Sequence, residues 1–236
     1  MQVLATHRTR NEDEVVAAYA RDERTRSGSR GPGASSTKRI SLAILAALAL
    51  CAGCGSNEIA TEEHSGGTVL TEVGWSAFAE QRYLDATESF EAAIAVDPLY
   101  ADAENGLGWV NLLFGLYDIA DVHFRKAISL GLPTQEARAG HAFVAELQGN
   151  YDEALAASAL VLAADPDFTL SRKEGIDFRD LRLSRARTFV SLGRFEDAMA
   201  EVDVIDPANN VNVASETFVD DLLEQIELLG ERLHDS

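Results

Sequence analysis

Residues 67–100 read GTVLTEVGWSAFAEQRYLDATESFEAAIAVDPLY, and their pattern of small, aromatic and bulky residues returns every 34 positions. Three such units follow one another without a gap, and a fourth follows after ten extra residues. The recurring positions are Gly74, Gly108, Ala142 and Ala186; Tyr83, Tyr117, Tyr151 and Phe195; Ala86, Ala120, Ala154 and Ala198; and Phe90, Phe124, Ser158 and Val202. Small residues let two helices cross closely and proline ends a helix, so each unit predicts a pair of antiparallel helices.

This pattern resembles the tetratricopeptide repeat (TPR) family over residues 67–212. The resemblance implies an all-α fold, a right-handed superhelix of four TPR-like helix pairs. The units are 67–100, 101–134, 135–168 and 179–212. Because members of the family carry different ligands on one scaffold, the resemblance implies a protein or peptide partner without identifying it.

The predicted first helices are 68–80, 102–114, 135–147 and 180–192, and the predicted second helices are 83–96, 117–130, 151–164 and 195–205. Residues 213–236 follow the array, and the spacing of their apolar residues over 214–233 predicts an amphipathic capping helix. Residues 169–178 interrupt the 34-residue period. Their alternating apolar residues predict a short β-hairpin or an ordered loop that packs over the edge of repeats three and four.

Charge is distributed unevenly along the chain. Residues 1–39 carry 8 Lys or Arg against 5 Asp or Glu, which leaves 12 against 34, a net charge of −22, for residues 40–236. Such a surface repels phosphate backbones, which argues against nucleic-acid binding. Residues 1–39 have too little apolar surface to fold alone, so we predict a disordered extension, explained by a start codon assigned too far upstream.

An apolar run at 40–50 follows two basic residues and leads into the sequence CAGC at 51–54. As a helix the run spans about 16 Å, which suits the core of a signal peptide and is too short for a membrane span. CAGC resembles the lipobox of bacterial lipoproteins, in which small residues stand before the modified cysteine. The resemblance implies a lipoprotein signal peptide over 40–53, lipidation of Cys54 and a mature chain that begins there.

Two cellular placements follow from these cysteines. Under the lipoprotein interpretation, residues 54–66 form a flexible tether and the array faces the periplasm of the bacterial cell envelope, where it binds an envelope protein or peptide. Gly55 rather than Asp after the cysteine implies anchoring in the outer membrane. The alternative is a soluble periplasmic accessory protein that uses Cys51 and Cys54 as a Cys-x-x-Cys redox pair.

The sequence contains no residue constellation typical of an enzyme. It lacks a Gly-rich phosphate loop, a His-Glu-x-x-His motif and a Gly-x-Ser-x-Gly motif. We therefore expect no enzymatic activity, no cofactor and no metal site. His141 stands where the earlier repeats have Val73 and Leu107, and we interpret it as a packed, hydrogen-bonded side chain rather than a ligand.

In the TPR family the first helix of each unit lines the concave face, and its ninth residue points into that face. The resemblance places Trp75, Trp109 and Phe143 there, and the twelfth position adds Phe78 and Leu112. Large side chains on this face predict a groove that accepts apolar or aromatic side chains of a peptide or protein. The alternative is that a short array closes on itself and that these rings pack internally.

A second candidate surface is electrostatic. Residues 172–194 contain seven basic and three acidic residues, a net charge of +4 within the acidic body. The basic patch consists of Arg172, Lys173, Arg179, Arg182 and Arg187. We predict that it pairs internally with the acidic capping helix through residues such as Glu216, Asp220 and Glu224, and a docking site for an acidic partner is the alternative.

Overall fold

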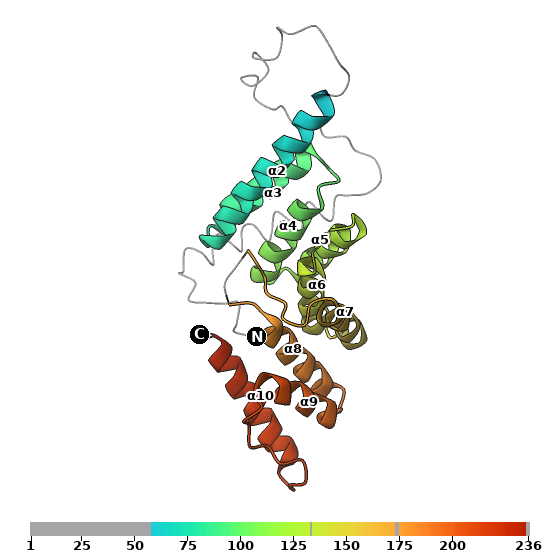
Figure 1. The fold of residues 1–236 in the computed structure, drawn as a ribbon, viewed down its shortest axis with the longest axis vertical. Helices are drawn as coiled ribbons and strands as arrows, with labels where there is room; N and C mark the ends of the chain where they lie inside the picture. Colours follow the sequence, from blue (N-terminus) through green and yellow to red (C-terminus); the bar gives the residue numbers. More distant parts are fainter. Residues whose placement is uncertain (1–57, 133, 173–174, 235–236) are drawn as a thin grey trace. The chain divides into compact units, whose positions relative to one another are not determined.

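The structure is a computed structural model that describes residues 58–132, 134–172 and 175–234, and it is all-α in these residues (Figure 1). The described helices form four TPR-like pairs and a capping helix. The pairs are α2 (Glu58–Ala79) with α3 (Tyr83–Val96), α4 (Ala101–Leu113) with α5 (Tyr117–Ser129), α6 (Glu136–Leu147) with α7 (Tyr151–Ala164), and α8 (Phe178–Ser191) with α9 (Phe195–Ile205); α10 (Phe218–His234) is the cap. The all-α class and the pairing are therefore confirmed.

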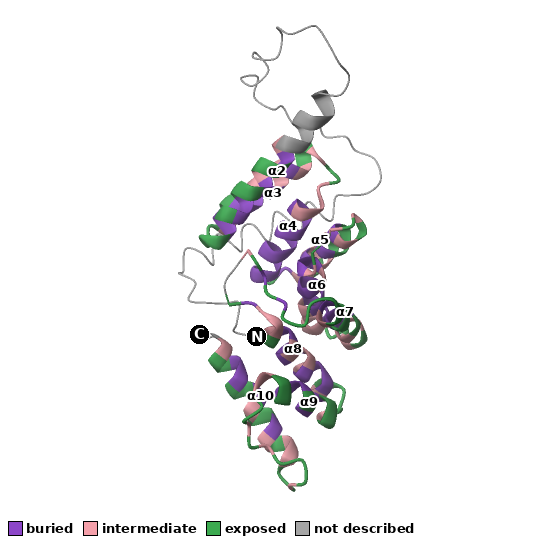
Figure 2. Ribbon diagram, viewed as in Figure 1, coloured by how far each residue is buried: buried purple, intermediate pink, exposed green. Residues whose placement is uncertain are grey.

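Each second helix also packs against the first helix of the next pair, so the core is continuous from repeat to repeat (Figure 2). At the end of the array, α10 packs on both α8 and α9. Its apolar residues Leu222, Ile226 and Leu229 are buried in a cluster with Val202 and Phe189. This is the cover that a terminal repeat needs, because each unit buries its apolar face only against a neighbour.

Glycine sets the closest helix contacts in the first half of the array. The ring of Phe90 on α3 lies between Gly74 and Gly106, where an added Cβ would come within 2.6 and 2.3 Å of its ring atoms. One unit later, the ring of Phe124 on α5 lies in the same way against Gly108 and Gly140. No residue larger than glycine fits at these positions unless the ring or a helix shifts.

Two predicted boundaries are wrong. Helix α2 begins at Glu58 and not at residue 68, so much of the expected tether is helical. Gly66 and Gly67 lie inside this helix, and Gly67 packs close to the end of α3, where an added Cβ would lie 3.7 Å from both Asp97 and Tyr100. The capping helix begins at Phe218, later than the predicted 214, because Asn212 and Ser215 side chains accept hydrogen bonds from nearby backbone amides and form turns.

The predicted disordered extension, signal peptide, Cys51 and Cys54 all lie outside the described residues. In the part of the chain that the structure describes, no helix combines the length and the apolar character that crossing a bilayer requires.

Candidate interaction surface

The large side chains predicted to line an open groove are core residues. Trp75 is 3% exposed, Leu112 is 2% exposed, and Phe78 and Trp109 are fully buried; only Phe143 is partly exposed. The prediction of an exposed aromatic groove is therefore wrong, and internal packing, the alternative, is what the structure contains.

Edge-to-face contacts explain why these rings are buried. Trp75 meets Phe78 at 5.4 Å and Phe90 at 5.1 Å between ring centroids, both nearly perpendicular. Trp109 meets Phe124 at 5.5 Å and Phe143, on the next first helix, at 6.3 Å. Aromatic pairs prefer this geometry, so the rings join neighbouring repeats. They lie beneath the surface formed by the first helices α2, α4, α6 and α8, which we call the first-helix face.

The segment between α7 and α8 covers part of this face. Thr169 and Asp177 form an isolated antiparallel bridge, and the Leu170 amide donates to the Ile176 carbonyl at 2.9 Å. Phe168, Leu170 and Ile176 are buried. The prediction of an ordered loop is confirmed in its described residues. The loop does not lie over repeats three and four alone, because beyond Leu170 the chain extends past α6 towards α4 and contacts repeats one and two (Figure 1).

Arg172 makes these long-range contacts. Its Nη1 lies 3.1 Å from Oε2 of Glu72 on α2, its Nη2 lies 3.6 Å from Oδ2 of Asp102 on α4, and its guanidinium carbon lies 5.5 Å from the Trp75 ring centroid. Asp102 also accepts a hydrogen bond from Trp75 Nε1 at 3.1 Å. Burial lowers the pKa of the Arg172 guanidinium, but Glu72, Asp102 and Glu136 outweigh burial and raise it above its ordinary value.

A buried hydrogen-bond set lies beside Arg172. Ser171 Oγ donates to Oε1 of Glu136 at 2.6 Å, and Asn105 Nδ2 donates to Oε2 of the same carboxylate at 3.2 Å. Two atoms on this face of α4 have no protein partner, Oδ1 of Asn105 and Nε1 of Trp109. Both side chains are fully buried, so one acceptor and one donor, at i and i+4 on α4, lie in the core without a protein partner.

These polar residues were not predicted from the sequence, although the sequence contains a signal for them. Asp102, Glu136 and Asp180 each occupy the second position of their unit, where the first unit has Thr68. A carboxylate that returns with the repeat period faces the same side of each first helix. These carboxylates make hydrogen bonds and ion pairs that hold the loop and the start of α8.

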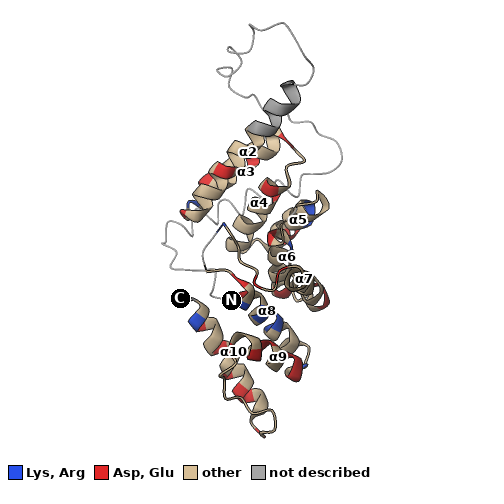
Figure 3. Ribbon diagram, viewed as in Figure 1, with Lys and Arg blue, Asp and Glu red and all other residues tan. Residues whose placement is uncertain are grey.

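The basic patch pairs internally, as predicted, but with other partners. Arg182 and its neighbour Arg185 both bind Glu201 on α9, at 2.8 and 2.6 Å, and Arg179 binds Asp177 at 2.6 Å. Figure 3 shows basic segments on α8 and acidic segments on α9. The predicted pairing with the capping helix is wrong, because among the described residues no ion pair joins the patch to Glu216, Asp220 or Glu224. Arg187 lies against Gly230 of α10, and Lys173 is outside the described residues.

His141 is packed between two carboxylates, as a buried histidine rather than an open ligand. Its Nδ1 lies 2.8 Å from Oδ1 of Asp121 and its Nε2 lies 3.3 Å from Oε1 of Glu153. The Nδ1 contact lacks hydrogen-bond geometry, so the predicted hydrogen bond is not made at this atom. Arg125 bridges the same two carboxylates. Within the described ranges, no group of three His, Cys, Asp or Glu side chains is arranged to hold a metal ion.

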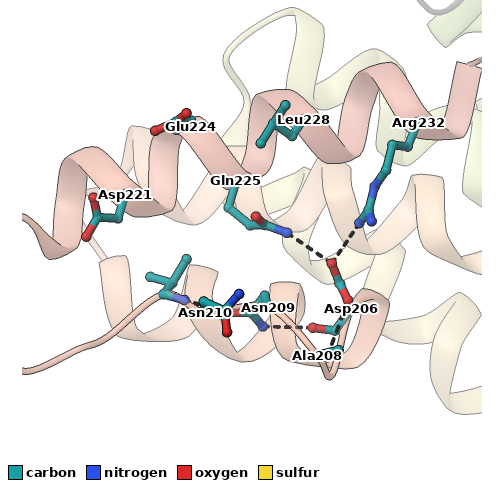
Figure 4. A pocket seen from close by; sticks show the side chains of 10 residues that line it. Asp206, Ala208, Asn209, Asn210, Asp221, Glu224, Gln225, Leu228 and Arg232 are labelled. Atoms are coloured by element: carbon teal, nitrogen blue, oxygen red, sulfur yellow. Dashed lines mark hydrogen bonds and ion pairs between the residues drawn. The ribbon is translucent and has the colours of Figure 1, made fainter.

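A second, open groove of about 410 Å³ lies between the segment after α9 and the side of α10 (Figure 4). Asp206 occupies one end, where it accepts hydrogen bonds from Arg232 Nη2 at 2.7 Å and from Gln225 Nε2 at 3.1 Å. The hydrogen bond from Arg232 is the largest cause of a lowered pKa at Asp206. Asp221 and Glu224 make the rest of the rim acidic, which does not suit an acidic partner.

No protein-family model and no curated protein sequence matches this chain. Several solved structures have a similar fold. A MamA structure is 16% identical with a TM-score of 0.51 over 73% of this chain and 86% of MamA, and MamA of MSR-1 is 17% identical with a TM-score of 0.52 over 70% and 97%. PilF of Pseudomonas aeruginosa is 15% identical with a TM-score of 0.52 over 74% of this chain and 76% of PilF. At these identities the likeness concerns the fold alone, and the chain has the fold of a TPR-like array.

Proposed function

We propose that this chain is a lipid-anchored TPR scaffold of the bacterial cell envelope that holds a protein partner on its first-helix face. The observation that carries the proposal is the loop after α7, a hairpin-like turn that lies on this face. It is bound there by side chains of α2, α4 and α6, through Glu72, Asp102 and Glu136. A face that holds a loop of its own chain through side-chain contacts has the chemistry to hold a segment of another protein.

The aromatic residues act indirectly in this proposal. Because Trp75 and Trp109 are buried, a partner does not insert between them. They fix the spacing of the first helices and so place the carboxylates and the partly exposed Phe143 on one surface. The recognition chemistry is therefore acidic with an apolar edge, which favours a basic partner segment, in keeping with a net charge of −22 over residues 40–236.

The proposed location depends on the CAGC sequence alone. A lipid on Cys54 holds the array at a membrane, and Gly55 after the cysteine favours the outer membrane with the repeats in the periplasm. The first described helix begins at Glu58, four residues after the proposed anchor. An anchored array would meet a partner of the same envelope at a raised local concentration.

One experiment tests both parts with the full chain expressed in a bacterium with an outer membrane. A photo-crosslinking phenylalanine derivative replaces Phe143 on α6 or, as the matched control, Leu160 on α7, which is 61% exposed. We expect intact-mass analysis of the membrane fraction to show a chain that begins at Cys54 with acyl groups. We also expect a discrete cross-linked partner from position 143 and none from 160.

The two readouts fail separately. A soluble chain with two free or disulfide-linked cysteines would contradict the anchor and favour the redox alternative. Equal cross-linking from both positions, or from neither, would contradict a partner on the first-helix face.

A further inference from the structure

The loop between α7 and α8 is held in two different ways along its length. Phe168, Leu170 and Ile176 are buried at its base, which fixes the base firmly. Arg172, further out, rests on charges that are partly in water, since its own side chain is 31% exposed and that of Glu72 is 58% exposed. Ion pairs exposed to this degree contribute little stability, so Arg172 is the part of the loop that leaves its site most easily.

The site under Arg172 has more negative charge than one arginine neutralises. Glu72, Asp102 and Glu136 come from three successive first helices, and Lys126, Arg138 and the other described cations are not paired with any of them. The Trp75 ring adds a face for a guanidinium at 5.5 Å. Carboxylates beside an aromatic ring are a recognition site for arginine, whose planar group pairs with acids and stacks on rings.

We propose that Arg172 is an internal ligand, occupying a site on the first-helix face that takes an arginine from an extended segment of a partner protein. The partner's arginine displaces Arg172 from Glu72, Asp102 and the Trp75 ring. The base of the loop stays in place during this exchange. The inference rests on the proposed binding role of this face and adds the chemistry of the partner.

The test uses the full chain and the short peptide acetyl-Gly-Ser-Arg-Gly-amide, which carries an arginine but none of the apolar residues that stay buried at the loop base. Calorimetry measures the dissociation constant for the parent and for Arg172→Ala, which vacates the site. We expect Arg172→Ala to bind the peptide at least about ten-fold more tightly than the parent. The matched control is Arg179→Ala, which removes an exposed arginine paired only with the nearby Asp177 and leaves the parent's affinity unchanged.

Two further measurements make the result specific to arginine. The same peptide with Ala in place of Arg should lose the gain in affinity. Adding Asp102→Asn to Arg172→Ala should weaken binding about ten-fold, because the amide still accepts from Trp75 Nε1 but no longer attracts a cation. Equal binding by Arg172→Ala and the parent, or equal binding of both peptides, would overturn the inference.

A measurement on the unaltered protein guards against a variant that fails to fold. Millimolar peptide should speed hydrogen exchange at residues 171–172 of the parent and leave the α8 residues after 179 unchanged, and no change at 171–172 would count against the inference. The outcome is also separable from the proposed function. A partner cross-linked at Phe143 together with failure of the arginine peptide would leave the scaffold role intact and remove the arginine site.

Discussion

The first half of the array (repeats one and two, α2–α5) and the second half (repeats three and four, α6–α9) fill the space between successive first helices with different side chains. In the first half, the rings of Phe90 and Phe124 fill the space between successive first helices, against paired glycines. In the second half, Ser158 occupies the equivalent position on α7. The guanidinium of Arg185, from α8, extends to it and donates to Ser158 Oγ at 3.0 Å and to the Leu155 carbonyl at 3.2 Å.

This difference shows that the repeat register does not require one kind of core. Arg185 stands where the second unit has Leu107, so a charged side chain replaces an apolar one and fills the volume of the missing ring. Its Nε donates to Glu201 at 2.6 Å, which compensates its charge. The first half therefore depends on shape and the second on a compensated charge, and the two should respond to different substitutions.

The largest effect is expected from Gly140→Ala on α6, because this glycine contacts the Phe124 ring that packs the first half. An added Cβ would lie 2.2 Å from Cζ and 2.4 Å from Cε1 of Phe124, and the ring has no space to retreat because Gly108 lies on its other side. We expect a loss of about 3 kcal/mol or more in the free energy of unfolding, measured by urea denaturation.

The control is Gly67→Ala, also inside a helix, where the nearest atoms are 3.7 Å away. Alanine is the better helix former, so this variant should be neutral or gain up to about 1 kcal/mol. Equal losses in the two variants would mean that helix bending, and not the ring, limits the glycine positions.

A smaller effect is expected from Arg185→Ala in the second half. The substitution removes the filler of the Ser158 space and one of the two cations on Glu201, which keeps Arg182. Because one partner remains, the loss should be about 2 kcal/mol, below that for a fully orphaned buried charge. Urea denaturation measures it.

Arg82→Ala tests whether burial, and not charge alone, sets this loss. Arg82 also pairs with two carboxylates, but all three side chains are more than half exposed. Its removal should cause no measurable loss. A comparable loss in both arginine variants would contradict the idea that Arg185 acts as a core residue.

The sequence predicted the features that recur in every repeat and did not predict the contacts between repeats. The predicted bounds are correct for three second helices, Tyr83–Val96, Tyr151–Ala164 and Phe195–Ile205. Each begins at the recurring tyrosine or phenylalanine and ends just before a proline, because local residue types decide these ends. Burial of Trp109 was not predicted correctly. Whether a first-helix side chain faces solvent depends on how closely the next repeat approaches, and that distance is set by Gly108 and Gly140 on two helices.

The interaction surface was less predictable for the same reason. The contact of Arg172 with Glu72 joins residues 100 positions apart, and no pattern within the loop indicates it. The sequence shows that Ser158 and Arg185 each interrupt the repeat pattern, at the positions of Phe124 and Leu107. It does not show that the two side chains form a hydrogen bond, because that contact depends on the geometry between two repeats.

Buried carboxylates extend the contrast between the halves. In the first half, burial alone would raise the pKa of Glu104, but hydrogen bonds from His123 and Lys126 lower it below its ordinary value. In the second half, burial raises the pKa of Glu146 and raises that of Asp180 to about 6. Relative to ordinary carboxyl groups, the first half thus shifts Glu104 towards the ionised form, and the second half shifts Glu146 and Asp180 towards the protonated form.

The smallest effect, and the one that separates the halves by pH, is expected from Asp180→Asn. Asp180 Oδ2 accepts from the Asp177 amide at 2.9 Å in the capping box of α8, and the amide oxygen of Asn keeps that bond without the charge. Because the folded pKa is raised from 3.8 to about 6, the parent has its full stability from this group below about pH 4 and loses it as the pH rises through 6. The variant should therefore be more stable than the parent by about 1 kcal/mol at pH 7.5. This gain is smaller than the free energy that corresponds to the whole pKa shift, because the variant also loses the attraction to Arg179.

The advantage should disappear below pH 4, as measured by urea denaturation across the pH range. The control Asp167→Asn, at an exposed position before the loop, should show no such trend. A variant that is less stable than the parent at pH 7.5 would mean that ionised Asp180 stabilises the start of α8, and the proposed electrostatic difference between the halves would then be wrong.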